Sequence, residues 1–400
     1  MKLTAEEQAM LDGAQGRATQ KAMQILLALG TIYGAEGLIP VSSVQVAGVS
    51  YDNLGEAGLA FLAEMADGGG KAQVLATLNP AGMDIQSWQS LGIPPDFAEK
   101  QLAVINAFEQ MDIQATCTCT PYLVGNLPGY GEHIAWSESS AVCYANAVLG
   151  ARSNREGGPS ALAAALTGRT PDYGLHRSEN RQPGLSVTVK ACLRENTDFG
   201  ALGKAIGERI QATKAVPYII GVDNASLEQL KSFCASLATY GGAALFHMPG
   251  ITPEANQHQA PAESLTITQA DLEAASRSLS DAAEEEVDFV SLGCPHLTLT
   301  EIARIAKILE GKQVTREFWI TTARPVKQMA DQLGYSRIIT AAGAKIAADT
   351  CCVVAPIKGR FTALAADSAK ACYYAAGKNK FKTLFLPFDE VVKLAVRERR

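Results

Sequence analysis

The sequence predicts an α/β protein with largely parallel, buried sheets. Beyond Arg181, short apolar runs alternate with segments of helical periodicity, which is typical of parallel strands layered with helices. The chain has 400 residues, too many for one ordinary hydrophobic core, so two or three domains are expected. Hydrophobic residues make up 47% and charged residues 19% of the chain, as in well-packed globular proteins and unlike disordered ones.

The first 180 residues are predicted to form an N-terminal α/β region. Thr4 and Glu7 have the spacing of a capping box, so a helix is expected to begin there and to end near Gly13. A turn is expected at 48–51. The other expected elements are helices over 18–29, 145–149 and 159–166, the last stopped by Gly168, and strands over 38–46 and 73–78.

Two further α/β domains are predicted over 181–285 and 286–400, with candidate boundaries near 180–183 and in the loop 252–263. Thr298 and Glu301 form a second capping box, which opens a helix. The acidic run 284–286 is expected to be a solvated helix end. Strands are expected over 185–192, 216–222, 243–246, 287–292, 318–321 and 352–357, and helices over 227–240, 270–284, 299–309 and 326–333.

Charge and composition exclude several classes of function. A net charge of −6 provides no basic surface for nucleic acid, and no apolar run is long enough to cross a membrane. The polar N-terminal segment lacks the core of a signal peptide, so a cytoplasmic location is expected. In that reducing compartment the nine cysteines are expected to be thiols or metal ligands. Dinucleotide, Walker and nucleophile-elbow motifs are absent, and no Cys-x2-Cys pair indicates a zinc ribbon.

Three cysteines stand in loop-like settings beside predicted strands. Cys119 precedes Thr-Pro-Tyr, Cys294 lies between a strand end and a helix start, and Cys351 precedes an apolar run. Such loops could converge at one edge of a sheet, where open α/β folds place their sites. The alternative is that these cysteines simply pack in the core, because their long-range spacing fits no short ligand rule.

The segment from Asn154 to Ser160 predicts an anion-binding site. Gly157 and Gly158 would let the backbone approach a ligand, and the start of the following helix would offer free amides. Arg155 could bind phosphate or carboxylate, and Ser160 could cap the helix. The alternative is an ordinary helix start with a surface arginine.

Single residues nearby have two interpretations each. Glu138 and Ser139 are the candidate catalytic residues. Glu138 could act in acid–base catalysis or be a buried, hydrogen-bonded carboxylate. Lys358 is a weaker candidate for anion binding, and a surface lysine is the alternative. His296, beside Cys294, could support a metal ligand or be structural.

At these residues the chain resembles the aconitase X family, specifically its large catalytic subunit, over essentially its whole length. The resemblance implies an aconitase-like multi-domain fold and a hydro-lyase. It implies a [4Fe-4S] cluster bound by Cys119, Cys294 and Cys351, with Cys117 and Cys352 as neighbouring alternatives. The blocks that carry the resemblance are Thr118–Tyr122, Ile134–Ala141, Tyr144–Ala151, Asn154–Ser160, Ala165–Arg169, Gly293–His296 and Asp349–Cys351.

The family includes enzymes for two substrates. One branch dehydrates (R)-5-phosphomevalonate to trans-anhydromevalonate 5-phosphate in an archaeal-type mevalonate pathway, and the other dehydrates cis-3-hydroxy-L-proline. The segment 154–158 is similar to the first branch, whereas Gln45 replaces the histidine of many relatives. The resemblance also implies a small swivelling subunit that supplies a catalytic serine. A cluster-binding redox or iron sensor is the non-enzyme alternative; the predicted anion site favours the enzyme.

Overall fold

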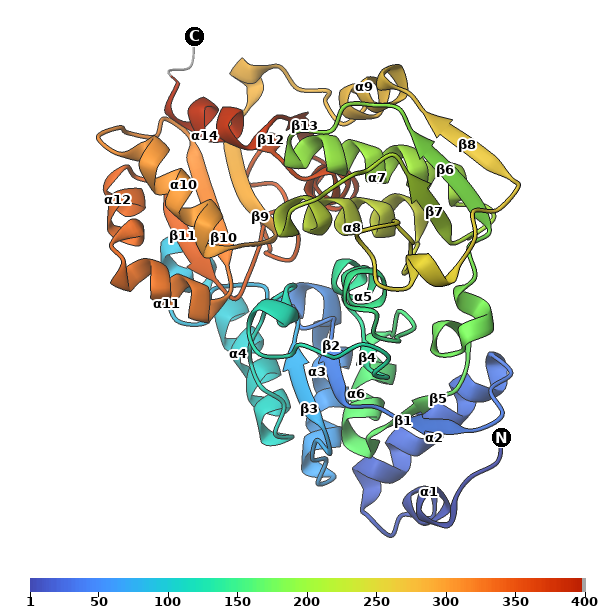
Figure 1. The fold of residues 1–400 in the computed structure, drawn as a ribbon. Helices are drawn as coiled ribbons and strands as arrows, with labels where there is room; N and C mark the ends of the chain where they lie inside the picture. The colour runs from blue at the N-terminus through green and yellow to red at the C-terminus, as the bar shows by residue number, and fades with distance from the viewer. Residues whose placement is uncertain (398–400) are drawn as a thin grey trace.

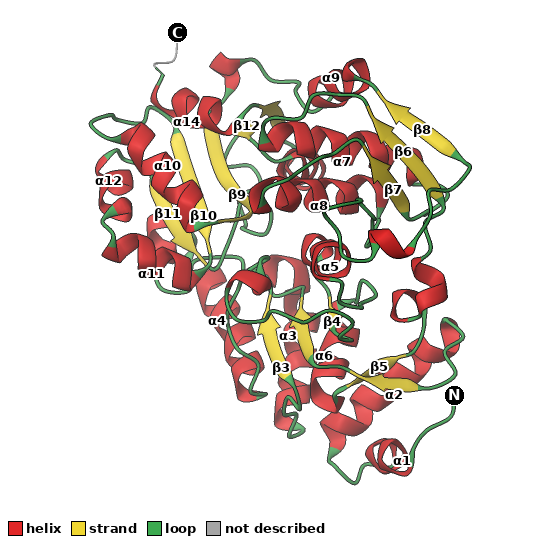
Figure 2. Cartoon of the chain, in the orientation of Figure 1, coloured by secondary structure: helices red, strands yellow, loops and turns green. Residues whose placement is uncertain are grey.

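The structure is a computed structural model that describes residues 1–397. It consists of parallel sheets flanked by helices, with a small antiparallel pair of strands near the N-terminus (Figure 1). Helices and strands alternate along most of the chain (Figure 2), as the α/β prediction requires. The fold class is therefore confirmed. The domain boundaries at 180 and 285 stay a prediction, and the last predicted range extends three residues beyond the described part.

The N-terminal region is built around a parallel sheet of strand order β3-β2-β4. Helices α2 and α6 pack together beside β2, and α3 packs on α4. Strands β1 and β5 form the separate antiparallel pair. The helices are α1 (Ala5–Leu11), α2 (Arg17–Ile32), α3 (Tyr51–Asp67), α4 (Pro95–Gln110), α5 (Ser139–Tyr144) and α6 (Gly158–Thr167), and the strands are β1 (Leu38–Pro40), β2 (Ser43–Val46), β3 (Leu75–Leu78), β4 (Ala135–Trp136) and β5 (Arg169–Pro171).

The middle of the chain forms a parallel sheet of order β7-β6-β8, with α7 and α8 packed closely on each other. Helix α5 of the N-terminal region also packs on α8, which joins the two parts (Figure 1). The elements are β6 (Leu185–Val189), α7 (Asn196–Ile210), β7 (Pro217–Ile220), α8 (Leu227–Gly241), β8 (Ser264–Ile267) and α9 (Gln269–Arg277).

The last part contains the largest sheet, in the order β11-β10-β9-β12-β13, and all its described pairings are parallel. Its core is apolar, with Val290, Leu292, Phe318 and Ile320 buried. The strands are β9 (Phe289–Leu297), β10 (Glu317–Thr322), β11 (Lys345–Ala348), β12 (Ala363–Ala366) and β13 (Lys382–Phe385), and the helices are α10 (Leu299–Leu309), α11 (Arg324–Gln332), α12 (Tyr335–Ala341), α13 (Ala369–Tyr374) and α14 (Phe388–Val396).

Both predicted capping boxes form, and α10 has the predicted bounds. Predictions of elements over three further ranges, 352–357, 243–246 and 270–284, are wrong. The run 352–357 is a series of turns, because the amides of Val354 and Ala355 fold back onto the carbonyl of Cys351. The run 243–246 is not a strand, and only a bridge between Tyr218 and His247 follows it. The helix over 270–284 ends at Arg277, after which the chain binds the edge of β13 through Asp281.

The segment 38–46 is two strands in different sheets, rather than one strand. The turn expected at 48–51 leads directly into α3, which begins at Tyr51. Short apolar segments such as 38–46 have no periodicity that shows whether they form one strand or two.

Candidate active site

Cys119, Cys294 and Cys351 lie close to one another although they are distant in sequence. Cys119 is held next to the carboxyl end of β3, because the amide of Thr118 donates to the carbonyl of Leu78 at 3.0 Å. Cys351 follows β11 and does not precede a strand, which corrects the predicted setting. The thiol of Cys351 lies near enough to the other two to affect them electrostatically. Burial is the largest cause of the raised pKa of Cys119 and of Cys294, and Cys351 raises both further.

Cys294 projects from a bulge within β9, whereas the sequence predicted a loop after the strand. The pairing with β10 shifts between Ile320, opposite Leu292, and Thr322, opposite Leu297, so the four residues 293–296 of β9 stand opposite the single residue 321 of β10. Gly293 has a φ of 116° and lies against Thr321, where a side chain would overlap the backbone. The bulge therefore depends on glycine and directs Cys294 out of the ladder.

The buried imidazole of His296 joins the three cysteine segments. Its Nδ1 lies 2.9 Å from Oγ1 of Thr118, and its Nε2 lies 2.9 Å from the carbonyl of Thr350. Its backbone amide donates to Sγ of Cys119 at 3.2 Å. His296 thus contacts the residues just before Cys119 and Cys351 while standing two residues after Cys294.

The residues at this position fit an iron–sulfur cluster. The three sulfur atoms do not form a trio within 4.8 Å of one another, since the one such group among residues 1–397 lies elsewhere. A single tetrahedral ion would keep its sulfurs about 3.8 Å apart, whereas a cluster binds each cysteine to a different iron. Buried polar atoms also lack partners around the cysteines: Gln45 Oε1, Asn79 Oδ1 and Thr350 Oγ1.

The neighbouring cysteines have other surroundings. Cys117 is fully buried in the apolar core of the N-terminal region, in the segment that hydrogen-bonds to β3. Cys352 is buried in an apolar cluster and has Ser291 as a hydrogen-bond partner. The choice of Cys119 and Cys351 over these neighbours stays a prediction.

The three thiols are protonated at neutral pH without a bound metal. Burial, then the charges of Glu138 and Cys351, raises the pKa of Cys119 to about 12. Burial likewise raises the pKa of Cys294 and of Cys351. Metal ligands must be thiolates, so binding releases protons from this site.

A buried ion pair between Glu138 and Lys370 adjoins the cysteines. Burial raises the pKa of Glu138, but the Lys370 charge and hydrogen bonds from Lys370, Asn79 and Ser140 outweigh it and lower the pKa to about 2. The Lys370 pKa is raised, although burial opposes this, mainly by Glu138. Both groups are therefore charged at neutral pH. Ser139 Oγ lies 3.4 Å from Lys370 Nζ.

Glu138 is oriented by the start of α5. It is the N-cap residue of this helix and accepts from the amide and hydroxyl of Ser140, at 3.3 and 2.9 Å. Asn79 Nδ2, just beyond β3, donates to its other oxygen at 2.8 Å. Of the two interpretations of Glu138, the hydrogen-bonded carboxylate agrees with this geometry.

The segment 154–160 lies at the start of α6, but its side chains differ in availability. Asn154 donates to the carbonyl of Tyr173 and accepts from the amide of Leu175, at 3.0 and 2.9 Å, which argues against a side-chain contact with substrate. Ser160 is not the cap residue; it bonds Glu156 and accepts from the amide of Gly157. Arg155 is exposed.

Gly158 and Lys358 also have local explanations. A Cβ on Gly158 would lie 2.8 Å from the carbonyl oxygen of Ala47, so the absent side chain permits α6 to pack on the end of β2. Lys358 is exposed in a turn, not at the end of a strand as expected.

Lys370 and Gln45 are contributions that the sequence did not reveal. Lys370 is a lone cation in the otherwise apolar start of α13, which is the signal that could have marked it. Gln45 Nε2 donates to the carbonyl of Thr118 at 2.8 Å and so supports the segment that carries Cys119.

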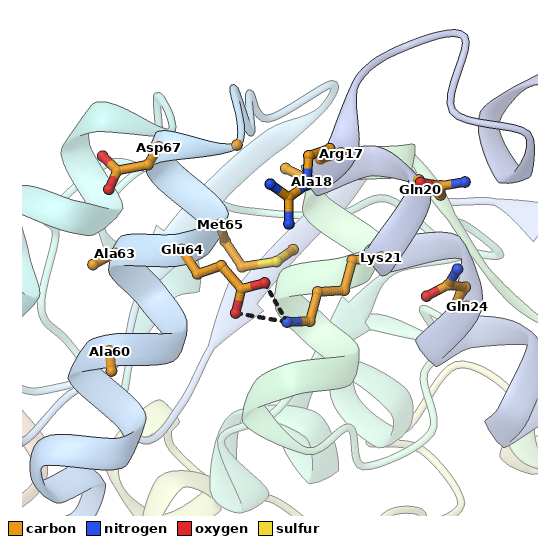
Figure 3. A pocket seen from close by; sticks show the side chains of 11 residues that line it. Arg17, Ala18, Gln20, Lys21, Gln24, Ala60, Ala63, Glu64, Met65 and Asp67 are labelled. Atoms are coloured by element: carbon orange, nitrogen blue, oxygen red, sulfur yellow. Dashed lines mark hydrogen bonds and ion pairs between the residues drawn. The ribbon is translucent and has the colours of Figure 1, made fainter.

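A large hollow lies elsewhere, between α2 and α3 (Figure 3). Its volume is about 760 Å³, and its lining includes Arg17, Gln20 and Asp67. Lys21 and Glu64 form an ion pair of 2.7 Å within it. None of the predicted site residues lines this hollow.

The chain is similar to known proteins in its domains, its sequence and its structure. Residues 1–179 match the aconitase X first domain, 183–277 the second domain and 287–397 the third domain. The chain belongs to the aconitase X family. A crystal structure of aconitase X from Thermococcus kodakaraensis, described as the holo-form, superposes with a TM-score of 0.92 at 43% identity and covers 99% of this chain and 100% of that one.

Aconitase X relatives with curated names fall into two groups. The phosphomevalonate dehydratase large subunits of Methanothermobacter thermautotrophicus and Thermococcus kodakarensis are each 45% identical, over 94% of this chain and 94% and 95% of their own lengths. The cis-3-hydroxy-L-proline dehydratase of Hypocrea jecorina is 34% identical over 94% of this chain and 65% of its own. No helix within residues 1–397 has the length and apolar character needed to cross a membrane.

Proposed function

We propose that this chain is the large subunit of an iron–sulfur hydro-lyase that dehydrates (R)-5-phosphomevalonate to trans-anhydromevalonate 5-phosphate. The main observation in support of this proposal is that Cys119, Cys294 and Cys351 lie close together beside the Glu138–Lys370 ion pair. The relatives named phosphomevalonate dehydratase large subunit match at 45% identity over nearly the whole chain, which supports this substrate over hydroxyproline.

The residues of the site have different roles in the proposed reaction. Cys119, Cys294 and Cys351 would hold the iron–sulfur cluster, which when bound would supply Lewis-acid chemistry toward the substrate hydroxyl. Lys370 Nζ offers a buried positive charge that suits the substrate carboxylate. With a pKa of about 2, Glu138 is too weak a base to remove a carbon-bound proton efficiently, so it holds Lys370 in place.

The proton step is assigned to a serine of a small swivelling subunit. Relative lengths support such a partner. This chain covers 94% and 95% of the two relatives named as large subunits, but only 65% of the Hypocrea and 70% of the Pseudomonas aeruginosa hydroxyproline dehydratases. We infer that the additional length of those proteins corresponds to the small subunit, which would be a separate chain here.

The phosphate is assigned to the start of α6, with Arg155 as its cation. Arg155 is exposed, and the helix start adds a favourable dipole. Lys358, also exposed, is the secondary candidate.

All nine cysteines are free, which supports a reducing, cytoplasmic location.

The test is a substrate panel on the anaerobically reconstituted chain, with and without the small subunit. We expect turnover of (R)-5-phosphomevalonate only when both chains are present, and cluster absorbance that changes when this substrate is added. Turnover by the single chain would refute the partnership. Equal turnover of mevalonate, or turnover of cis-3-hydroxy-L-proline alone, would refute the substrate. A cluster that no substrate perturbs would favour the sensor alternative.

Arg155→Ala tests the phosphate site. The change should raise KM for the phosphorylated substrate about 10-fold or more, because a charge-assisted hydrogen bond contributes about 1.5–3 kcal/mol. Arg277→Ala, at an exposed arginine of α9, is the matched control and should leave KM unchanged. An unchanged KM in Arg155→Ala would show that Arg155 does not bind the phosphate.

A further inference from the structure

A second group of side chains that could hold a metal ion lies away from the cysteines, in the connection between α8 and β8. One ring nitrogen each of His247 and His258 and one carboxylate oxygen of Glu254 lie within 4.8 Å of one another. The two imidazole rings are 4.3 Å apart between centroids. In Figure 1 this loop is the yellow segment beneath β7, beside the green segment that enters β6.

His247 presents an unused donor at this position. The side chain is fully buried, and its Nε2 lies 2.8 Å from the carbonyl of Arg181. Its Nδ1 is buried and has no partner within the described residues. A carbonyl can only accept, so Nε2 carries the proton in this hydrogen bond, and Nδ1 of the neutral imidazole carries a lone pair. An imidazole that donates one N–H to a backbone carbonyl while the other nitrogen is free has the arrangement of a metal ligand.

His258 and Glu254 are held in the same way. Nδ1 of His258 lies 3.1 Å from Oε1 of Gln182, which leaves Nε2 for a ligand. The Glu254 carboxylate accepts from Nε of Arg181 at 2.8 Å. A carboxylate has about four lone-pair positions, so a guanidinium on one side leaves others available. Arg181 therefore orients two of the three groups, one through its carbonyl and one through its side chain.

We propose that His247, Glu254 and His258 bind one divalent transition-metal ion of the zinc class. Two imidazoles and one carboxylate, with a fourth position open to water, are a common ligand set for such ions. Bonds of about 2.0–2.2 Å separate tetrahedral donors by about 3.4 Å, so the three groups would move together slightly on binding. The Arg181 charge weakens the site relative to an isolated set of the same ligands.

The bound ion would fasten the segment 181–182 to the loop 247–258. These two segments already meet through Arg181 and Gln182, and Arg181 also donates to Asn146 in the N-terminal region. The ion would therefore stabilise the connection between the first two parts of the chain and would stand apart from the chemistry at the cysteines.

The test uses zinc and the anaerobic full-length chain that carries its iron. One equivalent of Zn²⁺ is added, unbound metal is removed, and zinc and iron are counted by mass spectrometry together with Tm. We expect one retained zinc per chain, unchanged iron and a raised Tm. His258→Ala, at a half-buried position, and His247→Gln should both lose the zinc and its effect on Tm.

His133→Ala is the matched control. His133 faces His176 at 3.0 Å between their Nδ1 atoms but belongs to no three-ligand group in the part of the chain that the structure describes, so zinc should be retained. Failure of the wild-type chain to retain zinc would overturn the proposal. Retention by both His258→Ala and His247→Gln, or zinc uptake matched by loss of iron, would overturn it equally, because the metal would then be at the cysteines.

Discussion

At the scale of single residues, Lys370 has the largest expected effect on the reaction. Lys370→Met removes the cation assigned to the substrate carboxylate, so kcat/KM should fall about 10–150-fold for about 1.5–3 kcal/mol of lost binding. It also leaves Glu138 buried without its partner, which should destabilise the chain by about 3–5 kcal/mol. Steady-state kinetics and urea unfolding measure the two effects.

Lys393→Met is the control for this change. Lys393 is 48% exposed and pairs with Glu390 on the surface, so stability should change by less than about 1 kcal/mol. An unaltered kcat/KM in Lys370→Met would show that the buried pair serves the fold alone.

His176 should make stability depend on pH. Burial lowers its pKa to about 3, compared with about 6.5 in an unfolded chain. Between these values the unfolded chain binds a proton that the folded chain does not, so this contribution is complete above about pH 6.5 and is lost as pH falls. The slope approaches about 1.4 kcal/mol per pH unit near pH 5.

His176→Gln should reduce the loss of stability between pH 7 and pH 5, measured as the change in urea midpoint, while buried His247 and His296 continue to contribute to it. The hydrogen-bonding partner His133 is retained in the variant. If wild type and variant lose equal stability over this range, the imidazole is not the titrating group.

At the residue level, the sequence singled out segments in which chemically active residue types are concentrated locally, and the roles of their residues stay a prediction. The segments around Cys119, Glu138 and Cys294 carried recognisable combinations of residue types. Lys370 could not be paired with Glu138 in advance, because 232 positions separate them and only the fold brings them together. Asn154 was predicted to bind substrate, but its side chain is hydrogen-bonded to the backbone of Tyr173 and Leu175.

At the scale of elements, the bulge in β9 should govern metal binding. Gly293→Ala places a Cβ against the backbone of Thr321 and should displace Cys294, so bound iron should fall well below the wild-type level. Gly311→Ala has the same kind of backbone, with φ of 69°, but meets nothing within 4 Å. It should cost about 1 kcal/mol and leave iron unchanged. Equal iron in both variants would contradict a special role for the bulge.

His296→Ala tests the contact between the three cysteine segments. Loss of the bonds to Thr118 and Thr350 should loosen Cys119 and Cys351 and lower iron per chain, while the secondary structure seen by circular dichroism is retained. Full iron loading in this variant would show that the segments are positioned without the imidazole.

Element prediction depended on how local the determinants were. Helix α10 was predicted with its observed bounds because Thr298 and Glu301 fix its start by a local contact. The apolar run 352–357 misled, because burial alone does not distinguish a strand from turns that pack into a core. The bulge in β9 depends on its register with β10, which no single segment encodes.

At the scale of the whole molecule, Arg324 joins the N-terminal region to the last sheet. It donates to buried Asp84 at 2.8 Å and also contacts buried Asp349. Arg324→Met would leave two carboxylates buried without a cation, at a cost of about 3–5 kcal/mol. Urea unfolding checks this, with Arg277→Met, at a 70% exposed residue, as the control with less than about 1 kcal/mol. A small effect would show that the two regions are held by apolar packing.

The overall architecture followed from sequence in part. Alternating apolar and helical segments predicted parallel α/β layers, and the family resemblance supplied the aconitase-like fold. The strand orders, such as β11-β10-β9-β12-β13, could not be derived, because strand adjacency is set by crossovers rather than by local patterns.

The wide sequence separation of the cysteines has a consequence for biosynthesis. Cys119 and Cys351 are 232 residues apart, which corresponds to roughly 10–50 s of translation at about 5–20 residues per second. During that interval the nascent chain carries Cys119, later joined by Cys294, while the third proposed ligand, Cys351, does not yet exist. Iron delivery must therefore follow translation of the last sheet, and until then reducing conditions must protect a waiting thiol from oxidation.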